Sequence, residues 1–230
     1  MKNVLFPIFI WLLCSFNILA QDSKPIRVKA GEDIYQKLAK EIYLYPEFIQ
    51  GTIYFRNGNT NLANFNYNRM NGEMQFIDVK GDTLSVANEV TIKYINVAKD
   101  SFYYSEGYLQ LVKGNNAAKV ARKQVIKIID QQKIGAYDQP SSAGAISSYS
   151  SLSNDLRFYK LDVRQDVILA QQTTYFFGDK YNNFFRANKK NLLRNFSKKE
   201  RELNDYLKEN NIDFNKEEDL TKLIVFLKDY

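Results

Sequence analysis

The sequence predicts a mainly β protein of the α+β class, in which an antiparallel meander forms a sandwich or partial barrel and carries a C-terminal helical hairpin. From Gly51 onward, short runs alternate apolar and polar residues, with turn signals about every eight to twelve residues. The composition includes 16 Phe and 16 Tyr among 230 residues, and aromatic residues favour strands. Beyond residue 188 the apolar spacing becomes that of amphipathic helices.

The first twenty residues, MKNVLFPIFIWLLCSFNILA, have the features of an export signal. Lys2 provides the positive start, residues 4–16 the apolar core, and a small residue stands before Gln21. The apolar run is shorter than the roughly 20 residues that span a bilayer. We therefore predict a signal peptide over residues 1–20. An uncleaved anchor and lipidation of Cys14 are the alternatives.

After removal of that signal, the chain contains neither histidine nor cysteine. It then lacks the usual acid or base near neutral pH, the thiolate nucleophile and the common zinc ligands. This composition excludes Ser-His-Asp and Cys-His catalysis and also disulfides. The sequence has no phosphate-binding glycine loop and no EF-hand spacing. We expect no cofactor and no metal.

Carboxylate chemistry is the enzyme class that this composition leaves open, because two Asp or Glu side chains suffice for glycoside hydrolysis. The candidates are Glu73, Asp78, Asp82 and Glu89, and Asp78 with Asp82 could also contribute to a Ca²⁺ site. All four lie in or beside predicted turns, where acids are common. The turn interpretation is favoured, so we predict a protein that is not an enzyme, with no catalytic residue.

The predicted β domain covers residues 21–187 and begins with a short helix within Gly31–Ile42, for which extended backbone is the alternative. Asn57-Gly58 fits a type I′ turn between two strands, and Asn71-Gly72 makes a second reversal. The predicted strands cover residues 51–56, a return strand ending at 64–68, then 73–79, 90–97, 101–104, 108–113 and 117–129.

A polar segment at about 131–154 interrupts this pattern. Residues 141–153 include seven serines, a composition that buries little apolar surface. We expect a mobile solvated connection, with a gate or partner-binding loop as the alternative. Strands are predicted to resume at 156–162 and 166–177, with 182–187 as a last edge strand.

Residues 188–230 form the predicted helical tail. Ser197 and Glu200 have the spacing of a capping box, and Asn215 repeats that cap pattern before the second helix. The tail carries ten basic and nine acidic side chains, which predicts a balanced, solvated outer face. We expect the hairpin to dock on its own sheet, and docking on a partner is the alternative.

Removal of Lys2 with the predicted signal leaves a net charge of about +5, and one stretch accounts for all of it, with six basic residues against the single acid Asp130. The functional interpretation is contact with an anionic surface such as a membrane. The favoured alternative is the solvated face of a long strand. The basic residues are Lys113, Lys119, Arg122, Lys123, Lys127 and Lys133.

Tyrosines are the second candidate contact set. Tyr43, Tyr45 and Tyr103 could form a partner-binding aromatic surface, although filling of the core is the favoured alternative. Strand alternation places Tyr103 on the face opposite Phe102 and Tyr104, so at least one of these faces could be exposed.

Four stretches carry a resemblance to known sequences: YLYPEFIQGTIYFRNG, NFNYNRMNGEMQFIDVKGDTL, KIGAYDQPSSAGAISSYS and NKKNLLRNFSKKERELNDYLKENNIDFNKEEDL. In their order and wording they resemble a group of uncharacterised exported envelope proteins of Gram-negative bacteria. The resemblance implies a periplasmic or outer-membrane-associated location. It implies no activity, so no site residue follows from it.

These observations together predict a non-enzymatic envelope protein, a binding or accessory subunit of a periplasmic or outer-membrane complex. The expected partner is another envelope protein, with peripheral contact to an anionic membrane surface as a further possibility and no nucleic acid. The alternative is a carrier of a lipid or other amphiphile in a half-open β structure. Strands that are apolar on both faces would favour the carrier, whereas one polar face would favour an interaction domain.

Overall fold

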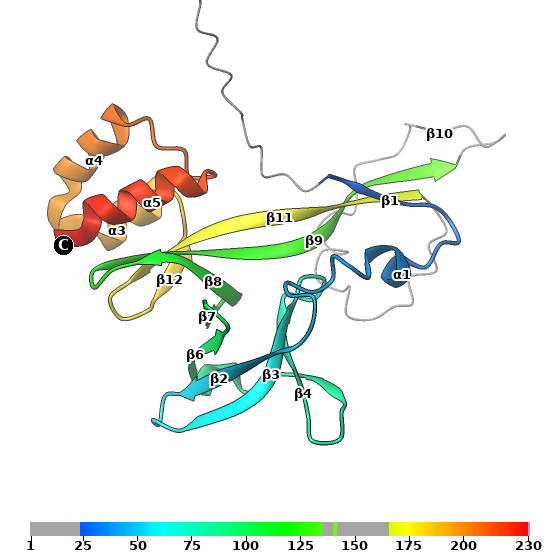
Figure 1. The fold of residues 1–230 in the computed structure, drawn as a ribbon. Coiled ribbons are helices and arrows are strands. Elements are labelled where there is room, and N and C mark those ends of the chain that lie inside the picture. The colour runs from blue at the N-terminus through cyan, green and yellow to red at the C-terminus, as the bar shows by residue number, and fades with distance from the viewer. Residues whose placement is uncertain (1–23, 135–139, 142–165, 230) are drawn as a thin grey trace, which may run out of the picture.

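The computed structural model describes residues 24–134, 140–141 and 166–229. Their fold is mainly β and consists of one large antiparallel sheet, not closed into a barrel, with the C-terminal helices packed at one end (Figure 1). The predicted fold class is confirmed. The predicted signal peptide, the predicted strand at 156–162 and most of the serine-rich segment lie outside the described residues.

The sheet contains twelve described strands. They are β1 (Ile26–Val28), β2 (Ile49–Phe55), β3 (Thr60–Asn68), β4 (Glu73–Ile77), β5 (Thr83–Ser85), β6 (Ile92–Val97), β7 (Asp100–Ser105), β8 (Gly107–Gly114), β9 (Ala118–Ile134), β10 (Pro140–Ser141), β11 (Asp166–Asp179) and β12 (Phe184–Arg186). The strand order is β1-β11-β9-β8-β7-β6-β2-β3-β4-β5, while β10 pairs with β9 and β12 with β11. The helices are α1 (Ile34–Leu38), α3 (Lys189–Asn195), α4 (Glu200–Glu209) and α5 (Glu217–Phe226).

The turn between β2 and β3 differs from the prediction. Only Gly58 has a positive φ, at 92°, so the type I′ assignment is wrong because that turn needs two such residues. The amide of Gly58 donates to the carbonyl of Phe55, and the amide of Phe55 donates to the carbonyl of Asn59. One left-handed glycine therefore completes a longer loop, and the strand pairing is as predicted.

Strands β2 to β8 curl around an apolar interior. Met74 and Ile95 are fully buried there, together with the ring of Phe102. The turn after β3 reaches back to β9, because the amide of Ile126 donates to the carbonyl of Arg69 at 2.9 Å. The meander is therefore a filled, partial barrel.

Strands β9 and β11 form a long two-stranded arm that extends away from the meander (Figure 1). Their register runs from Asp166 opposite Gln132 to Asp179 opposite Ala118, with a bulge between Ile168 and Leu169. Strand β9 continues to Ile134, so the predicted loop at 131–154 begins too early. The reason is that β11 supplies backbone partners for this polar segment, with Val167 opposite Gln131 and Asp166 opposite Gln132.

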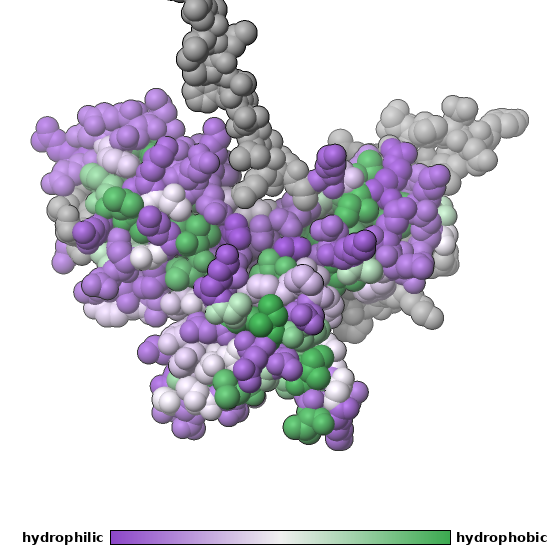
Figure 2. Space-filling model, viewed as in Figure 1, coloured by the Kyte–Doolittle hydropathy of each residue, from purple (hydrophilic) through white to green (hydrophobic). Residues whose placement is uncertain are grey.

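The C-terminal helices dock on the sheet of their own chain, as expected. Leu192, Leu203, Leu207, Leu220, Leu223, Ile224 and Leu227 are buried with Val120 of β9 and Phe177 of β11. Figure 2 shows hydrophilic residues over the outer side of these helices. The sequence placed the tail correctly and missed one helix, α3, whose first turn is capped by the Asn188 side chain.

The predicted capping box at Ser197 and Glu200 is wrong. Ser197 lies inside a 3₁₀ turn, Ser197–Lys199, that joins α3 to α4, and its side chain makes no cap. The cap predicted at Asn215 is also absent, since Lys216 occupies the N-cap position of α5 without a side-chain hydrogen bond. Phe196, with φ −118° and ψ 44°, ends α3, and Ser197 is already the first residue of the 3₁₀ turn instead of the extended residue that precedes a helix.

Helix α1 confirms the predicted short helix. Asp33 caps it by accepting hydrogen bonds from two backbone amides, and Ile34 and Leu38 are buried beside Val28 of β1. In the described part of the chain, none of the helices has the length and apolar character needed to cross a bilayer.

Candidate functional site

The meander has two chemically different faces, which follow from strand alternation. Inward residues such as Ile53, Ile95 and Phe102 are buried, whereas the outward residues of the same strands are half-buried or exposed. We call the outward set on four neighbouring strands the tyrosine face. It comprises Gln50, Thr52 and Tyr54 of β2, Thr60, Leu62 and Asn64 of β3, Tyr94 and Asn96 of β6, and Ser101 and Tyr103 of β7.

A row of aromatic rings crosses the tyrosine face. The rings of Tyr54 and Tyr94 stack at a centroid distance of 4.5 Å, and Tyr94 contacts Tyr103 at 5.9 Å. Phe184 of β12 continues the row at 5.2 Å from Tyr103 and packs over Gly178, where no side chain intervenes. Burial, and then the neighbouring Tyr94, raise the pKa of Tyr103 above its ordinary value.

A row of small polar side chains runs beside the rings. Thr52 of β2 lies opposite Asn96 of β6, which lies opposite Ser101 of β7. The hydroxyl of Ser101 donates to Oδ1 of Asn96 at 2.8 Å. Within the described residues, the hydroxyl of Thr52 and the Nδ2 group of Asn96 have no hydrogen-bond partner, so both can bind a ligand.

The tyrosine face is uncharged. None of its ten positions, all in the described part of the chain, holds Asp, Glu, Lys or Arg, although charged residues make up 25% of the sequence. At the border of the face, the exposed Lys93 of β6 places its ammonium 5.9 Å from the centre of the Tyr94 ring. Hydrogen-bonding groups and ring edges thus dominate the surface.

Strand alternation divides the predicted basic stretch between two faces. Arg122 points toward the helices, where Nη1 donates to Glu217 at 2.9 Å and Nε donates to Gln110 at 3.0 Å. Lys119 and Lys123 are on the other face, and their ammonium groups donate to the carbonyls of Asp179 and Glu106. Burial lowers the pKa of both lysines. These three cations have internal roles.

Of the remaining basic candidates, Lys127 is near enough to Lys123 for its charge to help lower the pKa of that lysine. Lys113 is exposed at the end of β8, and Lys127 is half-buried on β9. The backbone of Lys133 pairs with Ser141, while its side chain lies outside the description.

Tyr43 and Tyr45 secure the segment that precedes β2. The hydroxyl of Tyr45 donates to Asp100 at 2.6 Å, and that of Tyr43 donates to Gln75 at 2.9 Å. Burial raises the pKa of both phenols, and for Tyr45 the carboxylate of Asp100 raises it further. Of the three predicted tyrosines, only Tyr103 therefore belongs to the tyrosine face.

The candidate carboxylates serve mainly as turn and strand ligands. Asp78 accepts hydrogen bonds from the amides of Lys80 and Asp82, as the turn interpretation predicts. Glu73 accepts a hydrogen bond from the hydroxyl of Ser85 at 2.7 Å. The described residues contain no group of three or more acids that could hold a metal ion.

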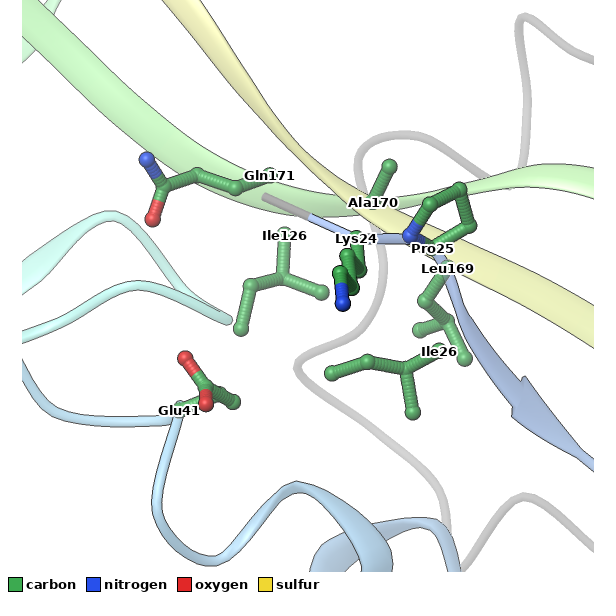
Figure 3. Close-up of a pocket in the computed structure, with 8 residues that line it drawn as sticks. All are labelled: Lys24, Pro25, Ile26, Glu41, Ile126, Leu169, Ala170 and Gln171. Atoms are coloured by element: carbon green, nitrogen blue, oxygen red, sulfur yellow. The ribbon is translucent and has the colours of Figure 1, made fainter. Parts of the chain in front are cut away.

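A pocket of about 250 Å³ lies where β1 meets the β9–β11 arm (Figure 3). Its walls include Ile26, Ile126 and Leu169; the ammonium of Lys24 points in among them and the carboxylate of Glu41 lies at one side. This volume is below the roughly 300 to 1,000 Å³ of ordinary ligand pockets. It is a weaker candidate than the tyrosine face.

Sequence reasoning missed three members of the aromatic row, namely Tyr54, Tyr94 and Phe184. Alternation in the segments around Ile53 and Ile95 could have shown that Tyr54 and Tyr94 point away from the core. The pairing of β2 with β6, which brings these two rings together, has no local sequence signal.

No known protein family, curated protein or solved structure matches this chain. The resemblance to exported envelope proteins therefore stays a prediction.

Proposed function

We propose that this chain is an exported, non-enzymatic binding protein of the cell envelope, which acts as a binding or accessory subunit and contacts its partner through the tyrosine face. The observation that carries the proposal is the absence of charge from ten outward positions on four adjacent, fully described strands. The cores of binding interfaces are depleted of charged residues and enriched in tyrosine. A face that only had to stay soluble would instead carry lysine and glutamate.

The filled interior supports this function over that of an amphiphile carrier. Met74, Ile95 and Phe102 occupy the centre of the meander with exposed fractions of 0–1%. The strands are apolar on the inner face and polar on the outer face, which is the pattern of an interaction domain. A carrier requires apolar lining around space for a chain.

The export part of the proposal has a direct test. The protein associated with the envelope fraction should begin at Gln21 when its N-terminus is sequenced. A protein that retains residues 1–20 or stays in the cytoplasm would contradict it.

The binding part is tested with a charge placed in the centre of the face. Tyr94→Glu should release the protein from envelope fractions, because a buried, unpaired carboxylate strongly disfavours association. Tyr181→Glu is the matched control, since Tyr181 is 70% exposed in the turn after β11 and lies outside the face. Equal retention of both variants, at unchanged melting temperature, would refute the role of the face.

A further inference from the structure

We infer that the tyrosine face binds a neutral, hydroxyl-rich polysaccharide chain that lies across strands β2, β6 and β7. This inference rests on the proposed function and names the ligand class of the same surface. Three features of the described residues support it. The face carries no charged side chain, several of its hydrogen-bonding groups have no partner, and its tyrosines and its small polar side chains recur from strand to strand.

The missing charge selects the ligand by electrostatic complementarity. An anionic glycan or lipid headgroup would be recognised by paired or clustered cations. Here Arg122, Lys119 and Lys123 donate to groups of their own chain, and the ammonium of Lys93 lies over the Tyr94 ring. A neutral ligand is the class that this surface accepts without leaving a charge unpaired.

Unused hydrogen-bonding groups point to a polar ligand. Among the described residues, no hydrogen bond satisfies the hydroxyls of Tyr54, Tyr94 and Tyr103, and Thr52 and Asn96 have free groups as noted above. Covering such groups with apolar surface costs about 1–3 kcal/mol each. Sugar hydroxyls both donate and accept, so they can satisfy every one of these groups.

The geometry of the rings has a consequence for how the ligand is recognised. Tyr54 and Tyr94 stack on each other with an interplanar angle of 27°, so each ring already uses one face. The row therefore presents hydroxyls and ring edges to a ligand, and recognition depends on phenol hydrogen bonds more than on stacking.

The regular recurrence of a tyrosine and a small polar side chain on neighbouring strands matches a polymer of repeating sugar units. Each of β2, β6 and β7 contributes one tyrosine and, two residues away, one hydroxyl or amide side chain. Neighbouring strands are about 4.8 Å apart, and positions i and i+2 about 7 Å apart. A polymer lying across the strands would meet the same pair of groups at each step, on a scale comparable with one sugar unit.

A protein partner fits the face less well. The residues that dominate protein interfaces are enriched in Trp, Tyr and Arg, whereas Ser and Thr are under-represented. The tyrosine face offers the tyrosines but no Trp or Arg at its ten described positions. Leu62 is the one large aliphatic residue among the outward positions, all of them described, and it lies at the border on β3. Small hydrogen-bonding side chains make up most of the remainder.

Binding is measured with the envelope-purified protein on immobilised neutral polysaccharides (β-glucan, glucomannan and dextran), with alginate and polygalacturonate as acidic probes. We expect saturable binding to at least one neutral polymer that changes less than about twofold between roughly 0.05 and 0.5 M salt, because no charge pair contributes. Tyrosine fluorescence reports the same event, since the single tryptophan is Trp11 in the predicted signal.

Conservative variants identify the contact. Tyr94→Phe and Asn96→Ala should each weaken binding about threefold to tenfold, the loss expected for one hydrogen bond. Tyr181→Phe is the control and should bind as the parent protein does. Because Tyr94→Phe retains the ring, it preserves the stack and the fold.

Two outcomes would overturn the polysaccharide inference and leave the proposed function standing, and a third would overturn both. Absence of binding to every neutral polymer, while Tyr94→Glu still releases the protein from envelopes, would mean that the face binds a protein. Binding only to the acidic polymers, abolished by salt, would mean that the ligand is anionic and binds the basic residues instead of the tyrosine face. If Tyr94→Glu is retained in envelopes as well, the proposed function itself fails.

Discussion

The docking of the C-terminal helices on the sheet can be tested by removing one buried side chain, Leu223 of α5. It is fully buried in the cluster that contains Val120 of β9 and Phe177 of β11. Leu223→Ala removes three carbon groups, worth about 2.4 kcal/mol at about 0.8 kcal/mol each, and leaves a cavity that adds to the loss. We expect the free energy of unfolding to fall by about 3 kcal/mol.

The matched control lies on the same helix. Val225 is 56% exposed, so Val225→Ala should change the free energy of unfolding by less than about 0.5 kcal/mol. In thermal denaturation, Leu223→Ala should melt about 6–12 °C below the parent protein, given about 2–4 °C per kcal/mol for a chain of this size. Equal melting temperatures for Leu223→Ala and Val225→Ala would refute the docking of α5 on the sheet.

Two further predictions concern ionisation and close packing. Burial, and then the charge and hydrogen bond of Glu217, raise the pKa of Tyr175 to about 12. The stability that the protonated phenol of Tyr175 contributes is therefore fully present below about pH 10, the pKa of a tyrosine in the unfolded chain. It is lost as the pH rises through about 12. Glu217→Gln should lower that pKa in an ultraviolet titration of the phenolate, and an unchanged titration would contradict the contact. Gly51→Ala should cost about 1–3 kcal/mol, because a Cβ there would collide with the β6 backbone and the ring of Phe65. The neighbouring outward variant Thr52→Ala should cost less than about 0.5 kcal/mol, and equal melting of the two would contradict this packing.

Much of the fold was predictable because its signals are local. Alternation in β2 and β6 identified strands, and the spacing of Leu220, Leu223 and Ile224 identified a helix with one buried stripe. The capping box at Ser197 failed for a local reason as well, because this serine is itself the first residue of a 3₁₀ turn and not the extended residue before a helix. The predicted turn type at Asn57-Gly58 is wrong because this dipeptide also fits a loop in which only the glycine has a positive φ.

The candidate site was predictable only in part. Alternation correctly separated Tyr103 from Phe102, which is buried. It could not show that the ring of Tyr103 lies beside those of Tyr94 and Phe184, because these contacts depend on which strands pair and in which register. The basic stretch shows the converse, since neighbours in sequence such as Arg122 and Lys123 point to opposite faces and find different partners.

The sequence by itself determined the class of fold, the docking stripe of the helical tail and the chemistries that a chain without mature His or Cys lacks. These properties depend on residue type and on periodicity along one segment. Only the tertiary structure decided that ten uncharged outward positions form one surface with a central tyrosine row. That surface depends on which strands pair and in which register, and those contacts gain their energy from burial between segments far apart in the chain.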